Sequence, residues 1–483
     1  MNEQSEQALL ASWQERQEYA ERMLPLLGNL YRNKAVEVSI YGRSLLGAST
    51  IDIIKAHRTV RLKEGDKLRL RESWPLLEQL SKLTLAPANV DLGKLAYAFH
   101  YQPQHKGKSI EQYLREELVD IVDVQDEHPA QDVVLYGFGR IGRLLARLLI
   151  ERQGKTNKLR LKAIVVRGGK EGDLEKRASL LRRDSVHGPF NGSITVDKER
   201  NAIKANGSYI QVIYANSPQD VDYTQFGINN AIVIDNTGMW RDEEGLGQHL
   251  SSNGVKKVLL TAPGKGKIKN IVHGVNHQDI HPQDNILSAA SCTTNAITPV
   301  LKVLDEAYGI NSGHVETIHS FTNDQNLIDN FHKADRRGRS AALNMVITET
   351  GAAEAVAKAY PGLEGKLTGS SIRVPTPNVS LAILNLHLKQ VTDKVTVNEF
   401  LREISLFSPL QHQVDFTASK EIVSTDLVGS RASSVVDSQA TIVAGDRATL
   451  YVWYDNEFGY SCQVLKVLQD MAGLRYPSLP LSK

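Results

Sequence analysis

One of the two cysteines in this 483-residue chain has the surroundings of a reactive thiol. Cys292 lies in SAASCTTN, among small and hydroxyl-bearing residues, and an amphipathic helix is predicted directly after it, over 293–305. The partial positive charge of a helix N-terminus favours the thiolate form. A lone cysteine is more often a small buried hydrophobic residue, so Cys292 by itself leaves a spacer, a metal ligand and a nucleophile open.

A base that could serve this thiol is His319, on or at the end of the predicted strand HVETIHS. An imidazole can take the thiol proton and then pair with the thiolate. The two residues are far apart in the sequence, so the fold has to bring them together. Together with a nucleotide-binding turn, Cys292 and His319 favour a nucleophilic role for the cysteine.

The segment GFGRIG predicts such a dinucleotide-binding turn. It follows an apolar strand, 133–136, and opens a predicted helix, 141–151. Gly137 permits the tight turn, Gly139 lets the backbone approach a pyrophosphate, and Gly142 allows close packing of helix on strand. The helix N-terminus would then face the phosphates. The alternative is a glycine-rich turn without a ligand.

The choice between NAD and NADP depends on the end of the second strand, AIVVRGGK. Val166 and Arg167 stand where a carboxylate usually binds the ribose hydroxyls. The missing carboxylate removes the repulsion of a 2′-phosphate, and Arg167 either pairs with that phosphate or faces solvent. The sequence therefore predicts that NADP is accepted, as sole or dual coenzyme.

An α/β scaffold is expected to position these groups. From residue 131 on, near-continuous apolar strands alternate with helical segments, which predicts a parallel sheet buried on both faces. Beyond Cys292 the strands alternate, which indicates a mixed or antiparallel sheet with one open face. We expect a Rossmann domain over 131–291, completed by a C-terminal helix 457–483, and an α+β catalytic domain over 292–456.

The first 130 residues have a different sequence pattern. Their apolar residues recur at helical spacing, which predicts a mostly helical region, and VEVSIYGRSL is predicted as a short strand. They carry no catalytic constellation. A packing or oligomerisation module is favoured over a regulatory or binding site.

Composition restricts the class of protein. The chain is 41% hydrophobic and 23% charged, and Lys+Arg 57 against Asp+Glu 55 gives a net charge of +2, so charge does not imply nucleic acid binding. Two cysteines form neither a disulfide framework nor a cysteine-based zinc site, and no metal is expected. Without a secretory signal or a membrane-length apolar run, we expect a cytoplasmic protein.

Six segments occur in the order found in one enzyme family: GFGRIGR, SCTTN, TIHSFTNDQ, TGAAEAV, GSSIRVPTPNVS and WYDNEFGYS. Over about residues 131–483 the chain resembles the phosphorylating glyceraldehyde-3-phosphate dehydrogenases. The resemblance implies that Cys292 attacks the aldehyde of glyceraldehyde 3-phosphate with His319 as base. A hydride would pass to NAD or NADP, and inorganic phosphate would release the acyl group from the resulting thioester.

The resemblance also implies binding positions and assembly. The substrate-phosphate positions are Thr322, Asp324 and Arg373, and the inorganic-phosphate positions are Ser291, Thr293, Thr350 and Gly351. The coenzyme positions are Gly137, Phe138, Gly139, Arg140, Ile141, Gly142, Arg167, Thr237, Gly238, Asn456 and Tyr460. Asn456 would hold the nicotinamide carboxamide, with Tyr460 beside it. The family implies a homotetramer, and RRGR (336–339) adds positive charge in the loop expected between subunits.

Three departures from the family pattern matter. Ala296 replaces a frequent second cysteine, so the thiol has no close disulfide partner. The missing ribose carboxylate leaves strict NAD preference open. The N-terminal extension leaves oligomer geometry and regulation open.

Two alternatives remain. Erythrose-4-phosphate dehydrogenase, a hydrolytic sister, is favoured by VLDEAYGINSG and HSFTNDQ, whereas TETGAA keeps the Thr350–Gly351 phosphate cradle and favours phosphorolysis. A non-catalytic binding protein on the same fold is the alternative of another class. Against it stand four intact positions: Cys292, His319, Arg373 and Asn456.

Overall fold

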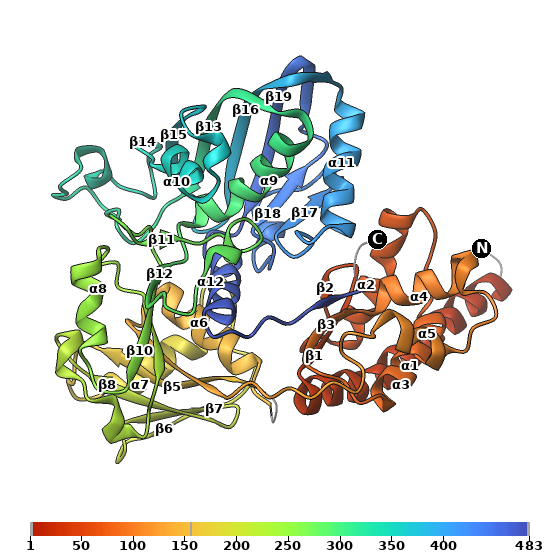
Figure 1. The fold of residues 1–483 in the computed structure, drawn as a ribbon, viewed down its shortest axis with the longest axis horizontal. Helices are drawn as coiled ribbons and strands as arrows, with labels where there is room; N and C mark the ends of the chain where they lie inside the picture. The colour runs from red at the N-terminus through yellow and green to blue at the C-terminus, as the bar shows by residue number, and fades with distance from the viewer. Residues whose placement is uncertain (1–2, 155–156, 481–483) are drawn as a thin grey trace. The chain divides into compact units, whose positions relative to one another are not determined.

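The computed structural model describes residues 3–154 and 157–480. The chain divides into two compact units, which are treated one at a time (Figure 1). The first unit consists of residues 1–130, 151–158 and 474–483. The second consists of residues 131–150 and 159–473.

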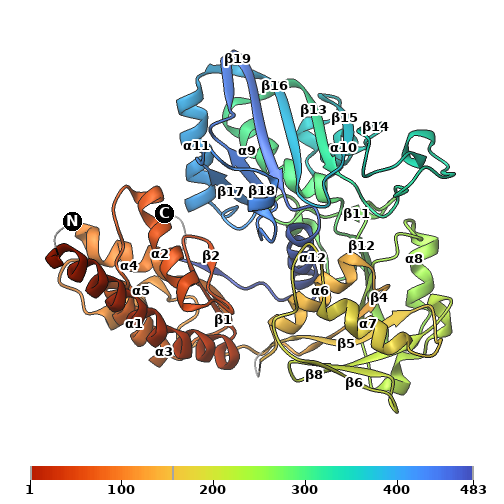
Figure 2. The same cartoon turned by 180° about the vertical axis from the view of Figure 1, so that it is seen from behind.

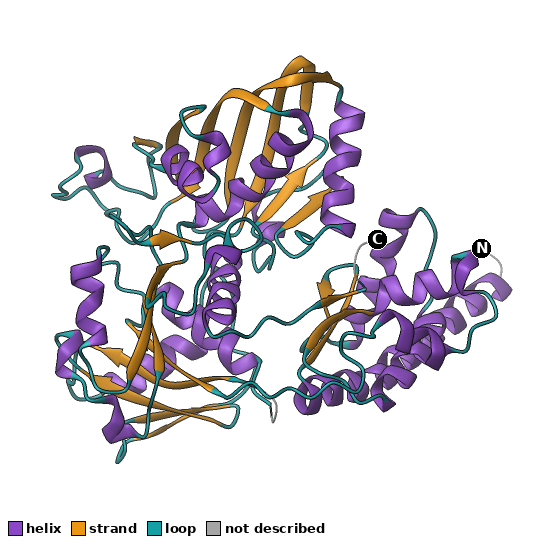
Figure 3. Cartoon of the chain, in the orientation of Figure 1, coloured by secondary structure: helices purple, strands orange, loops and turns teal. Residues whose placement is uncertain are grey.

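The first unit is mostly helical, as predicted, and holds a small sheet (Figure 3). Its helices are α1 (Glu3–Lys34), α2 (Thr50–Glu64), α3 (Leu70–Lys82), α4 (Leu92–Tyr101) and α5 (Ile110–Glu117). Its strands, in sheet order, are β2 (Arg43–Ser44), β1 (Val36–Ile40), β3 (Ala88–Asp91) and β20 (Ser478–Leu479). The predicted short strand is present as β1, but the chain turns after it and returns as β2, antiparallel to β1.

Capping residues and buried apolar faces fix these helices. Ser49 caps α2 and forms a reciprocal capping box with Asp52, and Gly65 ends the helix with φ +76°. Leu76, Leu77 and Leu80 of α3 are fully buried, so this amphipathic helix is held by its apolar face.

The C-terminal end of the chain differs from the expectation of a helix over 457–483. Helix α12 (Phe458–Met471) ends earlier, and β20 pairs in parallel with β3 of the first unit. Gly473 follows the helix with φ +76°, a left-handed conformation that stops helix growth. The last described residues therefore belong to the small sheet. The expected domain boundaries stay a prediction.

The second unit contains a nine-stranded sheet with the predicted Rossmann arrangement. In sheet order its strands are β11 (Lys269–Asn270), β12 (Ile286–Ser288), β10 (Val255–Leu260), β9 (Ala231–Asp235), β4 (Gln131–Tyr136), β5 (Leu159–Val166), β8 (Ser208–Tyr214), β7 (Ala202–Ala205) and β6 (Ile194–Asp197). The strands from β11 to β8 are parallel, and β7 and β6 are antiparallel additions. Because β4 lies between β5 and β9, the strand order reverses at β4.

Helices cover both faces of this sheet. They are α6 (Arg140–Glu151), α7 (Asp173–Arg182) and α8 (Glu243–Leu250). Figure 2 shows α6 and α7 across one face, and Leu246 of α8 packs on Val258 and Leu260 from the other. The near-continuous apolar strands are explained by this double burial.

The second sheet of this unit is mixed and has seven strands. In sheet order these are β14 (Val346–Thr348), β15 (Leu367–Val374), β13 (Ile310–Ser320), β16 (Ser380–Thr392), β19 (Ile442–Tyr454), β18 (Ser434–Asp437) and β17 (Val414–Thr417). Helices α9 (Cys292–Tyr308), α10 (Ala352–Ala359) and α11 (Lys394–Phe407) share one apolar core with one face of the sheet.

The other face of this sheet is open in the single chain, as the alternating strands predicted. Along β16, Ala382 and Leu384 are buried, whereas Leu381 and Ile383 are partly exposed. No helix among the described residues is long and apolar enough to cross a membrane.

Candidate active site

Cys292 is the first residue of α9, and Ser291 caps that helix. The Ser291 hydroxyl accepts the Thr294 N–H at 3.0 Å and lies 2.6 Å from the Thr294 hydroxyl. The core residues of α9, including Ile297, Val300 and Leu301, are fully buried, which holds the helix and its first residue still. The fold thus presents the thiol at a helix N-terminus, as predicted.

His319 lies on β13, next to its last residue, and its Nε2 is 3.5 Å from Cys292 Sγ. Its Nδ1 is 2.7 Å from the Ser320 carbonyl oxygen. Both the Ser320 carbonyl and Arg373 Nη1, a donor, face Nδ1. In the tautomer in which Nδ1 donates to the carbonyl, Nε2 keeps its lone pair for the thiol proton. The structure therefore brings the predicted nucleophile and base into direct contact.

Burial sets the resting protonation of this pair. It raises the pKa of the Cys292 thiol, against a lowering effect of Arg373. Burial and, to a smaller extent, the positive charge of Arg373 lower the pKa of His319 to about 3. Without substrate, both groups are accordingly neutral near pH 7.

Arg373 on β15 stands beside the base, because its backbone is paired in register with His319. Its Nη1 lies 2.8 Å from His319 Nδ1, 3.0 Å from the Ser320 carbonyl oxygen and 3.4 Å from the Thr322 hydroxyl. Its Nε is buried without a hydrogen-bond partner among the described residues. A guanidinium with an unused buried donor suits a tetrahedral anion.

Thr322 and Asp324 are also part of this cluster. The Thr322 hydroxyl donates to Asp324, which also accepts from Arg337 Nη1 at 2.8 Å. Burial acts to raise the pKa of Asp324, but the Thr322 hydroxyl, Arg373 and Arg337 outweigh it and hold that pKa below its usual value. Asp324 is therefore a carboxylate that orients its neighbours.

The four residues expected around inorganic phosphate lie at two helix starts. Thr293 is buried in α9, and its hydroxyl lies 3.0 Å from the Tyr454 hydroxyl. Thr350 accepts the N–H of Ala352 at 3.2 Å, and Gly351 is the N-cap residue of α10. Since α9 and α10 share one core, both helix starts are held by the same packing.

The glycine turn has the geometry that a dinucleotide requires. Gly137 has φ +90°, and a Cβ on Gly142 would lie 2.5 Å from the Gly137 carbonyl oxygen, so both positions need glycine. Gly139 has open space where a side chain would stand, which leaves room for a phosphate. The residues present therefore fit a bound dinucleotide at the N-terminus of α6.

The other turn residues support this geometry. Phe138 is buried, and Ile141 is partly buried. Arg140 donates to Asp184 at 3.0 Å and to Glu457 at 2.6 Å. Glu457 directly follows Asn456, so this ion-pair network ties the glycine turn to the loop expected at the nicotinamide.

Three further coenzyme positions lie at strand ends. The Thr237 hydroxyl donates to Asp235 at 2.7 Å, and Gly238 has φ +64°. Arg167 follows β5 and is exposed, and its Nη2 lies 3.3 Å from Met239 Sδ. No carboxylate ends β5, whose last residue is Val166.

Asn456 and Tyr460 lie at the loop and helix after β19. Asn456 Oδ1 accepts the Ser380 hydroxyl at 2.9 Å, and the Tyr460 hydroxyl donates to the Ala290 carbonyl at 2.8 Å. Sequence reasoning missed Ser380 and Glu457 as contributors to the site. Both stand inside the motifs GSSIRVPTPNVS and WYDNEFGYS, which were the available signal.

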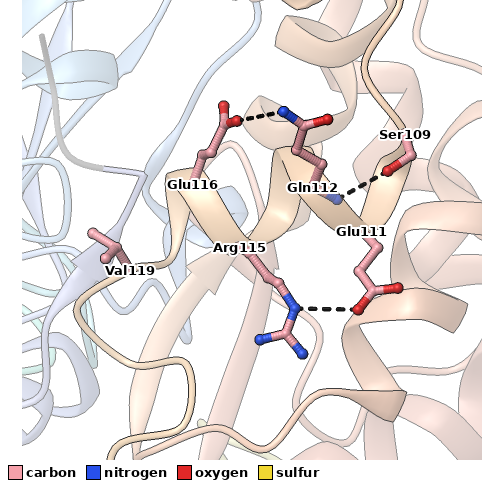
Figure 4. Close-up of a pocket in the computed structure, with 6 residues that line it drawn as sticks. All are labelled: Ser109, Glu111, Gln112, Arg115, Glu116 and Val119. Carbon is pink, nitrogen blue, oxygen red and sulfur yellow. Dashed lines mark hydrogen bonds and ion pairs between the residues drawn. The ribbon is translucent and has the colours of Figure 1, made fainter.

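A surface hollow on the first unit lacks the residue types of the Cys292 site. It is lined by Ser109, Glu111, Gln112, Arg115, Glu116 and Val119 (Figure 4). Arg115 pairs with Glu111 at 3.1 Å, and Gln112 donates to Glu116 at 3.0 Å. These side chains of α5 are hydrogen-bonded to one another, and the residues that line the hollow include no nucleophile–base pair.

Models of one protein family match the second unit. The glyceraldehyde 3-phosphate dehydrogenase NAD-binding domain matches residues 131–243, and the C-terminal domain of the same family matches residues 291–456.

Individual proteins are similar over longer stretches. A glyceraldehyde-3-phosphate dehydrogenase-like protein of Pseudomonas aeruginosa is 60% identical over 462 residues, 95% of this chain and 100% of that protein. Glyceraldehyde-3-phosphate dehydrogenase 2 of Nostoc sp. is 41% identical over 343 residues, 70% of this chain and 98% of that protein. The chloroplastic enzyme A of Zea mays is 41% identical over 334 residues, 69% of this chain and 80% of that protein. The first match is long enough to include most of residues 1–130.

The family matches agree with the geometry of the glycine turn and of the thiol. The chain is an enzyme, an oxidoreductase that uses NAD(P). It belongs to the glyceraldehyde-3-phosphate dehydrogenase family.

Proposed function

We propose that the protein oxidises glyceraldehyde 3-phosphate to 1,3-bisphosphoglycerate, reversibly, through a thioester on Cys292. The observation that carries this proposal is the 3.5 Å contact between Cys292 Sγ and His319 Nε2 at the start of α9. A thiol and a base at this distance, beside a guanidinium and a dinucleotide turn, are suited to aldehyde oxidation.

In the acylation half of the reaction, His319 Nε2 takes the thiol proton as Sγ attacks the aldehyde carbon. The backbone N–H groups at the start of α9 stabilise negative charge at that position. The bound nicotinamide supplies the hydride acceptor. Asn456 orients its carboxamide, and Glu457 and Arg140 hold that loop at the glycine turn.

In the deacylation half, inorganic phosphate attacks the thioester carbonyl and Cys292 leaves as thiolate. Ser291, Thr293, Thr350 and Gly351 are the proposed phosphate ligands. The Ser291 hydroxyl already caps α9, so it has one hydrogen-bond position left for an oxygen at most. Backbone N–H groups at the two helix starts therefore supply much of the proposed cradle.

Arg373 and Thr322 are the proposed ligands of the substrate phosphate. The unpaired buried Nε of Arg373 is the donor that this anion would satisfy. Asp324 is an acceptor only, so its proposed role is to hold Thr322 and Arg337 rather than to contact the anion.

We further propose that NADP is accepted, with Arg167 as the group that meets its 2′-phosphate. The support is the absence of a carboxylate at the end of β5 and the exposure of Arg167. Two cysteines in 483 residues fit a reducing compartment, and we propose the cytoplasm.

A homo-oligomer, most simply a tetramer, is the proposed assembly. The segment 327–347 exposes large apolar side chains next to RRGR: Leu327, Ile328, Phe331, Leu343, Met345 and Ile347. Phe331 is 91% exposed in the single chain. Such a dense apolar surface, like the open sheet face, is typical of a subunit interface.

A steady-state assay tests the function. It compares NAD with NADP, with and without inorganic phosphate, for glyceraldehyde 3-phosphate and erythrose 4-phosphate. Phosphate-dependent reduction with glyceraldehyde 3-phosphate, absent in Cys292→Ser, supports the proposal. Phosphate-independent turnover of erythrose 4-phosphate would favour the hydrolytic sister, and no turnover with any substrate would favour a binding protein.

A further inference from the structure

Ser380 joins the two strand ends that carry the base and the nicotinamide-binding residue. It is the first residue of β16, paired in register with Tyr454 at the end of β19, and its neighbour Leu381 pairs with Ile318 of β13. Its side chain is 1% exposed. Ser380 Oγ lies 3.0 Å from the Ser320 backbone nitrogen and 2.9 Å from Asn456 Oδ1.

The direction of both hydrogen bonds follows from the donor or acceptor that faces the Ser380 hydroxyl, a backbone N–H on one side and an amide oxygen on the other. A backbone N–H can only donate, so the Ser320 N–H occupies a lone pair of the Ser380 hydroxyl. The hydroxyl proton is then directed to Asn456, whose Oδ1 accepts it. This bond stabilises the orientation of the Asn456 amide in which Oδ1 faces Ser380. The Nδ2 group, which has no hydrogen-bond partner among the described residues, is left as a donor.

The turn before Ser380 has a strained backbone that supports this placement. Val379 is β-branched and has φ +66°, a left-handed conformation that such residues rarely adopt. Its carbonyl accepts the Ser320 hydroxyl at 2.9 Å, and the Ser320 hydroxyl also lies 3.1 Å from that of Thr376. Strain of this kind persists where surrounding contacts hold it, and it is concentrated at functional sites.

We infer that Ser380 is a positioning residue that fixes the Asn456 amide, so that its Nδ2 donates to the nicotinamide carboxamide and one face of the ring receives the hydride. This inference rests on the proposed function, because it assigns Asn456 to the nicotinamide. It adds a residue that touches neither substrate nor coenzyme and acts on the coenzyme through Asn456.

The two orientations of an asparagine amide have nearly the same shape, so only hydrogen bonds choose between them. Without the Ser380 hydroxyl, Asn456 is free to present Oδ1 to the coenzyme. The amide oxygen Oδ1 would accept from the carboxamide NH₂ group, whereas Nδ2 would donate to the carboxamide oxygen. A coenzyme held by that oxygen would present its carboxamide NH₂ group to Asn456, and the ring would no longer be restricted to one face toward the substrate.

The test compares Ser380→Ala and Ser380→Cys with the wild type and with Ser405→Ala. Ser405 is a matched control, since it is buried and its hydroxyl donates only to the Arg402 carbonyl within α11. The cysteine variant nearly keeps the shape of the serine side chain, but its thiol is a weaker donor than a hydroxyl, so we expect a smaller effect than in Ser380→Ala. It also keeps the test available if the alanine variant fails to fold.

Two readouts are measured. The dissociation constant of NAD, by calorimetry without substrate, is expected to rise about tenfold in Ser380→Ala and less in Ser380→Cys. Oxidation of unlabelled aldehyde with NAD deuterated at C4 reports, by NMR of the reduced product, which ring face took hydrogen. Single-face transfer is expected for the wild type and Ser405→Ala, and transfer to both faces for the Ser380 variants.

The alkylation rate of Cys292 should stay within about twofold of wild type in these variants, because Ser380 contacts the base only through the backbone of Ser320 and not through the His319 ring or the thiol. Wild-type affinity and single-face transfer in both Ser380 variants would overturn the inference while leaving the proposed function intact. A wild type that neither binds NAD nor turns over would instead overturn the proposed function.

Discussion

Arg373 Nη1 lies 2.8 Å from His319 Nδ1, at the atom of the base that faces away from Cys292. The positive charge there opposes protonation of the imidazole and contributes to the low pKa of His319. A phosphate dianion bound to Arg373 would neutralise that charge. We therefore expect substrate binding to raise the pKa of His319 and so to strengthen it as a base.

The role of Arg373 is tested with two aldehydes. Arg373→Ala should lower kcat/KM for glyceraldehyde 3-phosphate about ten- to a hundredfold, the range of one charge-assisted interaction. The value for unphosphorylated glyceraldehyde should change little. Arg447→Ala, an exposed arginine on β19, is the control. An equal loss of kcat/KM for both aldehydes would show that Arg373 does not bind the substrate phosphate.

His319→Asn should slow acylation by roughly 10²–10⁴-fold, the range for a positioned general base. Alkylation of Cys292 by iodoacetamide at neutral pH should slow as well, because the thiol loses its proton acceptor. His314→Asn is a matched control on the same strand, where His314 bonds to Thr368 and Ser370. Unchanged alkylation in His319→Asn would contradict the pairing.

A buried histidine, His57, should make the first unit sensitive to acid. Burial lowers the pKa of His57 to about 4, from 6.5 in the unfolded chain. Between these values the unfolded state binds a proton that the native state does not, so stability is retained above pH 6.5 and falls by about 3 kcal/mol as the pH drops to 4.

His57→Gln should remove this pH dependence, although the variant is less stable at pH 7. The stability of the first unit at pH 7 and at pH 4.5 is measured by amide hydrogen exchange of peptides from α2 and α3. His100→Gln, at an exposed histidine, is the control. The same acid sensitivity in His57→Gln and the wild type would show that other groups cause it.

Arg167→Ala should raise the Michaelis constant for NADP about ten- to a hundredfold and leave that for NAD unchanged. Arg160→Ala provides the control, since Arg160 is exposed at the opposite end of β5. Strong NAD selectivity in the wild type, unaffected by Arg167→Ala, would show that the arginine faces solvent only.

The proposed assembly depends on segment 327–347. Phe331→Glu should dissociate the oligomer, because it places a charge in an apolar interface. Light scattering at micromolar concentration measures the mass, and Val395→Glu, at an exposed position of α11, should leave it unchanged. A monomeric wild type would contradict the assembly.

The sequence predicted features that depend on local pattern. Gly137 and Gly142 were predictable because strand, turn and helix are contiguous, and Cys292 because its helix follows at once. The contact of Arg373 with His319 depends on the pairing register of β13 and β15, which no local pattern encodes. Two-residue β20 is too short for any periodicity, so its place beside β3 could not be predicted.

The central claim, covalent catalysis by Cys292, is tested most directly by intact-protein and peptide mass spectrometry. Enzyme is mixed with NAD and glyceraldehyde 3-phosphate without inorganic phosphate, then quenched in acid. The account predicts one 3-phosphoglyceroyl group on Cys292, which disappears when phosphate is added before the quench and never forms in Cys292→Ser. Reduced coenzyme formed while Cys292 stays unmodified, or an equal yield in Cys292→Ser, would contradict it.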